Sequence, residues 1–415
     1  MEKKNVPKIR FPGFTEPWEQ RKFSELYEKN TEKNVNLIGY DKTISIATMT
    51  YKDEGNGASE ESLKTYKVLR MGDLAFEGHT NKEFRYGRFV ANDIGIGIMS
   101  PRFSALRPIN EMPISFWKYY IHYEPIMRKI LVNSTKAGTM MNELVISDFM
   151  EQRIQVPSYE EQNKIGGLFD KLDNLISLHQ RKLENLKKQK KGLLQKMFPE
   201  KGKKVPEIRF PEFTDAWEQR KLGELSKSFE YGLNVAAKEF DGKNKYIRIT
   251  DIDDESHNFI NDDLTSPNIN LSNADNYKLS QGDILFARTG ASVGKSYIYK
   301  ESDGIVYYAG FLIRARIKEE VNPEFVFQNT LTKDYEKYIS VTSQRSGQPG
   351  VNAQEYAEYK IMIPSKEEQD KISDYMRKFD NLITLHQREC KFYSFNLIQI
   401  RISLPNLCLC FQVLV

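Results

Sequence analysis

The chain has 415 residues, of which 40% are apolar, so it is longer than one hydrophobic core usually serves and can build two or three domains. Its N-terminus has no apolar stretch of signal-peptide length, which argues against export and predicts a cytoplasmic protein without a membrane partner. The net charge is only +4, yet residues 181–204 contain ten Lys or Arg against two Glu, so the basic excess is local.

The chain opens with a block that it later repeats. Residues 6–26 return at 205–225 with 15 of 21 positions identical, and residues 160–182 return at 367–389 with 14 of 23 identical. Two copies are too few for a solenoid, which needs at least three stacked units. We therefore expect a pseudo-twofold internal repeat, in which similar frames carry dissimilar inserts and grip two different sites at a fixed separation on duplex DNA.

The first insert, residues 27–156, shares faint motifs with the second insert, residues 226–363. The pair Gly72-Asp73, followed by an apolar residue, recurs 210 residues later, and so does Pro113. Proline at such a position predicts the start of a helix. The two inserts therefore suggest one mixed α/β fold with different surfaces.

Two segments have the composition of functional loops. Residues 79–88 and 343–350 are polar, contain Gly and lack apolar periodicity. Asn, Gln and Arg can make bidentate contacts with bases, so these loops are candidate DNA readers; the alternative is that they are ordinary solvated loops. The candidates are Lys82, Arg85, Arg88, Gln344, Arg345 and Gln348.

Residues 160–197 predict a long helix. Apolar side chains recur there at alternating steps of three and four, the pattern of a coiled-coil seam, and Pro157 is followed by Ser and by acidic residues suited to a first turn. The basic segment 181–204 lies mostly on this helix, where it forms either a solvated face or a contact for phosphate or an acidic partner. The predicted seam residues are Leu168, Leu172, Leu175, His179, Leu183 and Leu186.

The second repeated block begins the same seam with Phe379, Leu382 and His386. We expect His179 and His386, which share an LHQR context, to fix the register of helix pairing. No metal site is expected, because the five His residues are scattered without HxxxH spacing and without a neighbouring Cys pair.

The second insert contains three runs rich in β-branched and aromatic residues, at 245–253, 282–290 and 304–317, which predict strands. The segment Gly294-Lys295-Ser296 looks like the end of a phosphate-binding loop, but the motif requires Gly at position 289, where the chain has Thr. Nucleotide binding is therefore not expected. We expect instead a Gly-rich loop between two strands, and three of its residues can face nucleic acid: Arg288, Thr289 and Lys295.

The sequence contains no motif for catalysis. None of the 16 Pro residues is adjacent to another, which excludes the (N/D)PP(F/Y) loop of amino-methyltransferases, and Walker A, HExxH and GxSxG motifs are absent. We expect a protein without catalytic residues that reads DNA. A cryptic carboxylate nuclease and a structural coiled-coil adaptor without sequence readout are the alternatives.

The C-terminal sequence departs from the repeat. After Glu389 the first copy predicts a LENLKKQKK-like continuation, but residues 390–415 contain all three Cys, two basic residues and no acidic ones. A frameshift that ends the second helix at Glu389 explains this change. It would expose the first helix over 186–197 and weaken assembly. A membrane anchor is disfavoured by the short uncharged run, interrupted by Pro405, and a Cys metal site lacks a fourth ligand.

The two IRFPxFTxxWEQRKxxEL openings, the Gly-Asp strands, the EEQxKI entries and the helix LDNLISLHQRKLENLKKQKKGLLQKMF resemble the specificity subunit of a type I restriction-modification system, over residues 1–389. The resemblance implies that each insert reads one half of a bipartite asymmetric site in double-stranded DNA. It also implies an antiparallel coiled coil that sets the spacer between the halves.

The same resemblance implies partner subunits. Two modification subunits would methylate adenine with S-adenosylmethionine, and two restriction subunits would cleave DNA with ATP and magnesium, so that this chain binds no cofactor itself. The alternative is a truncated, assembly-impaired version of such a subunit.

The expected fold class is α/β (α+β). It divides into a target-recognition domain over 1–156, a spacer helix over 157–204, a second target-recognition domain over 205–363, a truncated second helix over 364–389 and an aberrant apolar tail over 390–415.

Overall fold

The computed structural model describes residues 10–52, 54, 57 and 59–406. The chain divides into two compact units: unit 1 consists of residues 1–180 and 387–415, and unit 2 consists of residues 181–386. Among the described helices, none combines the length and the apolarity that crossing a membrane requires. The end of the predicted tail, with Cys408 and Cys410, lies outside the described residues.

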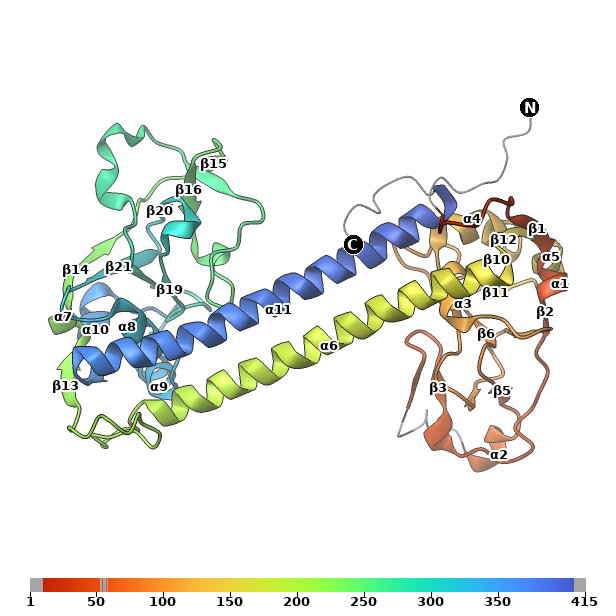
Figure 1. The fold of residues 1–415 in the computed structure, drawn as a ribbon, viewed down its shortest axis with the longest axis horizontal. Helices are drawn as coiled ribbons and strands as arrows, with labels where there is room; N and C mark the ends of the chain where they lie inside the picture. Colours follow the sequence, from red (N-terminus) through yellow and green to blue (C-terminus); the bar gives the residue numbers. More distant parts are fainter. Residues whose placement is uncertain (1–9, 53, 55–56, 58, 407–415) are drawn as a thin grey trace. The chain divides into compact units, whose positions relative to one another are not determined.

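A four-stranded antiparallel sheet is the centre of unit 1 (Figure 1). Its order is β2 (Tyr27–Lys29), β9 (Ala105–Pro108), β6 (Leu74–Glu77) and β7 (Arg88–Ala91). Every residue of β6 is buried. Leu74 and Phe76 join one apolar cluster and Ala75 joins another, because successive side chains of a strand point to opposite faces.

The ends of the first insert meet in a second strand pair. β1 (Glu19–Lys22) pairs antiparallel with β12 (Arg153–Val156), so the repeated opening is joined to the segment that leads into the long helix. The other elements of unit 1 are α1 (Phe23–Leu26), η1 (Tyr40–Lys42), β3 (Ile44–Ser45), β4 (Thr50–Tyr51), α2 (Glu60–Leu63), β5 (Lys67–Leu69), β8 (Gly97–Met99), α3 (Ile114–Tyr120), α4 (Glu124–Val132), β10 (Thr135–Lys136), β11 (Glu143–Leu144) and α5 (Ile146–Glu151).

Unit 2 contains the same kinds of pairing. Its four-stranded sheet has the order β14 (Ser226–Tyr231), β21 (Leu312–Ile317), β18 (Ile284–Ala287) and β19 (Ser296–Ile298), and β13 (Glu218–Lys221) pairs with β22 (Lys360–Ile363). The other elements are α7 (Leu222–Leu225), β15 (Ala237–Glu239), β16 (Asn244–Ile247), η2 (Ile249–Asp251), β17 (Thr265–Pro267), η3 (Leu271–Asn273), η4 (Asp275–Tyr277), η5 (Glu301–Asp303), β20 (Ile305–Tyr308), α8 (Pro323–Asn329), α9 (Lys333–Thr342) and α10 (Ala353–Ala357).

Local sequence signals account for several boundaries. Pro113 precedes α3 and Pro323 begins α8, as predicted for both positions. The predicted strand over 304–317 is two strands instead, β20 and β21, because the chain turns at 309–311. The predicted strand over 245–253 is limited to β16, after which a 3-10 turn follows.

Two long helices extend through both units: α6 (Tyr159–Met197) and α11 (Lys366–Asn406). Within unit 2, Lys190 Nζ lies 2.6 Å from Asp380 Oδ1. Within unit 1, His179 Nδ1 lies 2.7 Å from Glu389 Oε2, and its ring centroid lies 5.4 Å from that of Tyr393. Each unit therefore contains a segment of α6 in contact with a segment of α11.

The predicted end of the second helix at Glu389 is wrong. α11 continues to Asn406, and Leu397 packs against the core of unit 1. The predicted exposure over 186–197 is also corrected for Leu194 and Met197, which are 4% and 3% exposed. They belong to the main apolar cluster of unit 2, which also includes Ile372 in the first turns of α11, so the core of unit 2 buries them.

Candidate nucleic-acid interface

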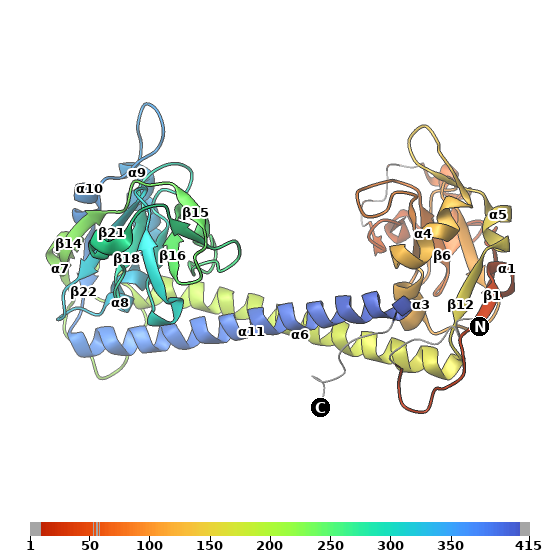
Figure 2. The same cartoon turned by 90° about the horizontal axis from the view of Figure 1, so that it is seen from above.

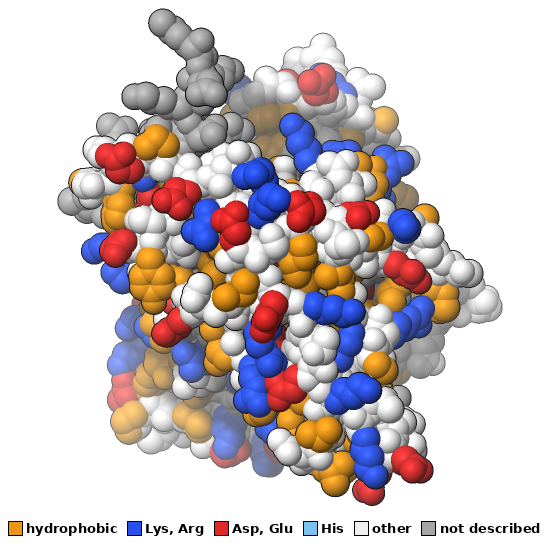
Figure 3. Space-filling view, turned by 90° about the vertical axis from the view of Figure 1, so that its right-hand side faces the viewer, with side chains coloured by type: hydrophobic (Ala, Val, Ile, Leu, Met, Phe, Trp, Pro, Cys, Tyr) orange, Lys and Arg blue, Asp and Glu red, His pale blue; other side chains and the backbone are white. Residues whose placement is uncertain are grey.

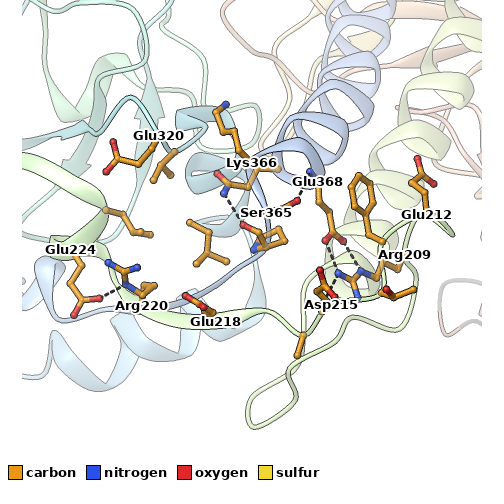
Figure 4. A pocket seen from close by; sticks show the side chains of 18 residues that line it. Arg209, Glu212, Asp215, Glu218, Arg220, Glu224, Glu320, Ser365, Lys366 and Glu368 are labelled. Carbon is orange, nitrogen blue, oxygen red and sulfur yellow. Dashed lines mark hydrogen bonds and ion pairs between the residues drawn. The ribbon is translucent and has the colours of Figure 1, made fainter.

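The two duplicated blocks form an ion pair in each unit. In unit 2, Arg209 Nε and Nη2 each donate to a carboxylate oxygen of Glu368 at 2.7 Å (Figure 4). In unit 1, Arg10 makes the same two bonds with Glu161, at 2.7 and 2.5 Å. Both Glu side chains are 1% exposed, and their hydrogen bonds raise the pKa of both Arg residues above the ordinary value.

These pairs give the first-turn acidic residues of α6 and α11 a role that sequence analysis missed: they anchor the repeated openings. In unit 2 the pair borders a cavity of about 470 Å³, along which Arg220 Nε donates to Glu224 at 2.8 Å (Figure 4). Glu212 at the same cavity pairs with Lys371. Because three ion pairs at this cavity hold the repeated opening together and join it to α11, the cavity fits a structural joint between strand and helix better than a catalytic centre.

A buried aspartate fixes the start of each central strand. Asp73 accepts a hydrogen bond from Arg107 Nη2 at 2.8 Å, and Asp283 accepts one from Arg316 Nε at 3.1 Å. The Gly residues before them have φ angles of +87° and +83°, a conformation that Gly adopts without strain. The repeated Gly-Asp motif therefore positions the hairpins β6–β7 and β18–β19.

Glu32 extends this network in unit 1. Its carboxylate accepts hydrogen bonds from Arg70 Nη2 and Arg107 Nη1, both at 2.7 Å. The bond from Arg70, followed by that from Arg107, lowers the pKa of Glu32 from its ordinary 4.5 to about 2.

The β18–β19 loop and the loop 343–350 lie side by side in unit 2. Thr289 forms an antiparallel bridge with Gly350, and the N–H of Val351 donates to the carbonyl of Arg288 at 2.9 Å. The structure thus brings Arg288 and Thr289 next to the loop that carries Gln344, Arg345 and Gln348. Figure 2 shows this second loop, in blue, projecting beyond α9 and α10.

An aromatic surface adjoins these loops. The Arg288 guanidinium lies 4.9 Å from the ring centroid of Tyr231, and the N–H of Arg288 donates to the carbonyl of Phe311 at 3.1 Å. Tyr231 and Phe311 are 43% and 61% exposed. Exposed aromatic rings beside an arginine have the chemistry required to contact bases. Neither ring was predicted as a reader, because Phe311 lies inside the predicted strand over 304–317 and Tyr231 lies in a stretch where no motif was identified.

Two of the predicted readers in unit 2 are held by the protein itself. The Lys295 side chain is 11% exposed, donates to the carbonyl of Ile252 at 3.0 Å and pairs with Asp254. The prediction that Lys295 faces nucleic acid is therefore corrected: its partners come from a neighbouring segment of unit 2. Arg345 is partly exposed but pairs with Glu355. Gln344 and Gln348 are exposed.

In unit 1 the predicted loop connects β6 and β7. Lys82 and Arg85 are exposed on it. Arg88 is the first residue of β7 and not a loop residue. Its guanidinium lies 4.9 Å from the ring centroid of Phe84 and donates to the carbonyl of Ala47 at 3.0 Å, so contacts within unit 1 orient it.

No counterpart of loop 343–350 was predicted in unit 1, and the structure supplies one at 134–142. The N–H of Asn142 donates to the carbonyl of Gly78 at 2.9 Å, as Val351 does at the end of β18. An offset of 209 residues would have found this loop, since it aligns Ser134 with Ser343. A groove of about 380 Å³ runs beside it, lined in part by Phe76, Arg102, Phe103, Thr139, Met140 and Asn142.

The predicted seam residues differ in exposure. Leu172 and His179 are buried, whereas Leu168, Leu175, Leu183, Leu186, Phe379 and His386 are half-buried. Leu382 is 44% exposed and the next residue, Ile383, is 8% exposed. The predicted coiled-coil seam is therefore corrected at Leu382, because the buried side of α11 passes through Ile383 instead.

The basic segment 181–204 is partly neutralised within unit 2. Lys187 pairs with Glu255 at 2.8 Å and Lys196 with Glu207 at 2.7 Å, and Lys190 pairs with Asp380 as described above. On the face of unit 1 drawn in Figure 3, basic, acidic and apolar side chains are intermingled. Local loops are therefore better candidates for base contacts than an extended basic surface.

Comparison with known proteins identifies relatives of the chain. The type I restriction enzyme MjaVIII specificity subunit of Methanocaldococcus jannaschii is 25% identical over 286 residues, which are 65% of this chain and 65% of that protein. This chain therefore aligns with less than two thirds of that relative. The putative type I restriction enzyme MjaX specificity subunit of the same organism is 21% identical, over 93% of this chain and 92% of that protein.

The fold has a solved counterpart. The crystal structure of the type I restriction-modification S subunit from M. genitalium matches 96% of this chain and 98% of its own length, with a TM-score of 0.57 and 14% identity. At that identity the likeness concerns the fold: mixed α/β units with long helices. The family described as type I restriction modification DNA specificity domain matches residues 83–188 and 214–391, more than half of the sequence, and the chain belongs to this family.

Proposed function

We propose that this chain is a non-catalytic specificity subunit that recognises a bipartite, asymmetric site in double-stranded DNA, with one half read by each unit. The observation that carries the proposal is a pair of matched sheets whose hairpin loops differ in sequence. Gly-Asp motifs begin both central strands, while the loops that follow share no run of identical residues. Matched scaffolds with different loops suit two different half-sites.

The readers would be loop residues that solvent reaches. In unit 2 these are the half-buried Arg288 and Thr289 and the exposed Gln344 and Gln348, and in unit 1 they are the exposed Lys82 and Arg85. Arg and Gln have the donor and acceptor geometry for bidentate contacts with guanine and adenine in the major groove. Lys82 suits a phosphate, which would add affinity that falls with salt.

The long helices would set the distance between the half-sites as an antiparallel coiled coil. Lys190 meets Asp380, whereas the earlier residue His179 meets the later residue Glu389, an order that supports antiparallel pairing of α6 and α11. The His179–Glu389 contact would help to fix the register, as a polar residue at a seam position does. A pseudo-twofold relation between the two frames would follow from this pairing.

The chemistry would belong to partner subunits. Two modification subunits would bind S-adenosylmethionine and methylate adenine, and two restriction subunits would use ATP and magnesium to cleave DNA. The duplicated openings and the helices would dock them, since these are the parts that both copies share.

A change of reading frame after codon 389 remains our explanation for the tail sequence, and genomic DNA lacking a LENLKKQKK-like continuation in another frame would reject it.

Mapping methylated adenines after co-expression with a cognate modification subunit tests the proposal. We expect methylation at one bipartite sequence. Exchanging loop 343–350 for that of another specificity subunit should alter one half of the sequence and leave the other unchanged. Affinity that does not depend on DNA sequence would favour a coiled-coil adaptor, and metal-dependent cleavage by the isolated chain would favour a nuclease.

A further inference from the structure

The turn before β9 in unit 1 and the turn before β21 in unit 2 occupy equivalent places in their four-stranded sheets. Leu74 pairs with Leu106 of β9, and Ile284 pairs with Ala315 of β21. Leu74 and Ile284 both follow the Gly-Asp motif directly, so their pairing partners are equivalent residues. Four residues before these partners stand Arg102 and Phe311.

Arg102 is an exposed side chain beside the loops of unit 1. Its Nη2 lies 3.7 Å from the sulfur of Met140, in the loop 134–142, and it lines the groove between that loop and β6. Within the described part of the chain, Arg102 forms no ion pair. Because a thioether sulfur is a weak acceptor, the guanidinium can exchange this contact for a stronger one with a ligand that enters the groove.

Phe311 is an exposed ring on a fixed backbone. Its carbonyl accepts the N–H of Arg288 at 3.1 Å, and the N–H of the adjacent Gly310 donates to Leu233 at 2.6 Å. A side chain at Gly232 would collide with the carbonyl of Ala309, so the two segments approach as closely as backbones allow. A rigid mount lowers the entropic cost of using the ring for binding.

We infer that this position discriminates bases, and that Arg102 reads a guanine in the half-site of unit 1 while Phe311 reads the methyl group of a thymine in the half-site of unit 2. The inference rests on the proposed function. Arg donates to O6 and N7 of guanine, and an apolar ring packs on the C5-methyl of thymine in the major groove. A single exposed Phe is ordinary by itself. Phe311 is assigned a role in base reading because it occupies the position equivalent to the exposed Arg102 and because both lie beside matching loops.

Base analogues test the two contacts separately. The full chain, in complex with its modification subunits, is titrated with duplexes that carry the mapped site, and affinity is measured by fluorescence anisotropy. Replacing thymine with uracil in the unit 2 half-site removes only the methyl group and should weaken wild-type binding about fourfold at one position. Replacing guanine with 7-deazaguanine in the unit 1 half-site removes one acceptor and should weaken binding about fivefold at one position.

Variants assign each effect to its residue. Phe311→Ala should bind thymine and uracil duplexes equally, whereas Phe311→Leu, which keeps an apolar contact, should still discriminate. Arg102→Leu, which removes every donor, should lose the 7-deazaguanine effect, whereas Arg102→Lys, which keeps a donor for O6 or N7, should retain part of it. Both positions are exposed, so the variants should fold normally.

Three results would overturn the inference. In the first, wild type binds both analogue duplexes as tightly as the natural site. In the second, Phe311→Ala still distinguishes the thymine duplex from the uracil duplex. In the third, Phe311 wedges between bases and unstacks them, and the thymine and uracil duplexes bind equally well. In each case sequence-dependent binding would leave the proposed function standing. Binding that ignores half-site sequence altogether would reject both proposals.

Discussion

Replacing Arg209 with Met should destabilise the joint between the repeated opening and α11 more than most single substitutions. The change keeps an apolar stem of similar length but leaves the carboxylate of Glu368, which is 1% exposed, without its guanidinium. Removing one partner of a buried ion pair costs about 3–5 kcal/mol, because the remaining charge stays out of water and uncompensated. We expect a loss in this range.

Unit 1 offers a matched comparison. Arg10→Met also removes a guanidinium, but Trp18 Nε1 donates to Glu161 Oε2 at 3.1 Å and would remain. A hydrogen bond to a charged group contributes about 1.5–3 kcal/mol, so Arg10→Met should cost less than Arg209→Met. Hydrogen exchange measured by mass spectrometry separates the units, and faster exchange should be confined to the start of α11 for Arg209→Met and to the start of α6 for Arg10→Met.

The double variant Arg209→Met/Glu368→Leu is the control. It removes both charges, and because a buried ion pair can be replaced by apolar residues at little net cost, it should recover more than half of the lost stability. A single variant within about 1 kcal/mol of wild type would contradict a buried, uncompensated Glu368 carboxylate. A double variant that exchanges its amide hydrogens as fast as the single one would contradict it as well.

Three further outcomes are expected. Glu32 has a pKa of about 2 in the fold against 4.5 ordinarily, so its stabilisation of unit 1 is complete above about pH 4.5 and is lost as the pH falls toward 2. In urea unfolding at pH 6 and pH 3, Glu32→Gln should therefore lose less free energy of unfolding between the two pH values than wild type does. Ile383→Ala should cost about 2–4 kcal/mol in thermal unfolding and Leu382→Ala less than about 1, and equal losses would contradict the corrected seam. Deleting residues 390–415 should speed hydrogen exchange around His179 in unit 1 and leave unit 2 unchanged, whereas loss of protection in unit 2 would reject this assignment.

Local signals made much of the fold predictable. Proline at 113 and 323 marked helix starts, Gly-Asp marked the turns into the central strands, and the period of three and four marked the long helices. These features depend on neighbours within a few residues, which a sequence displays directly. The loops at 79–87 and 343–350 were recognisable for the same reason.

Features that depend on distant partners were not predictable. Arg209 and Glu368 are 159 residues apart, and only their shared position in repeated blocks connects them. Lys295 looked free because Asp254 lies far from it in sequence. Leu382 and Ile383 are both apolar, so periodicity alone could not decide which one is buried. These ion pairs and the burial of Ile383 are determined by packing against parts of the chain that are distant in sequence.

The division of the chain has a consequence for the order in which the protein is made. Unit 2 is one continuous segment, so all of its contacts are possible once residue 386 has been synthesised. Unit 1 is discontinuous: Leu397 packs against its core but is translated more than 200 residues after the α6 segment of that unit. Domains commonly fold as they emerge from the ribosome. Here the first unit to be translated is the last to be completed, and it depends on the part of the sequence that departs most from the repeat.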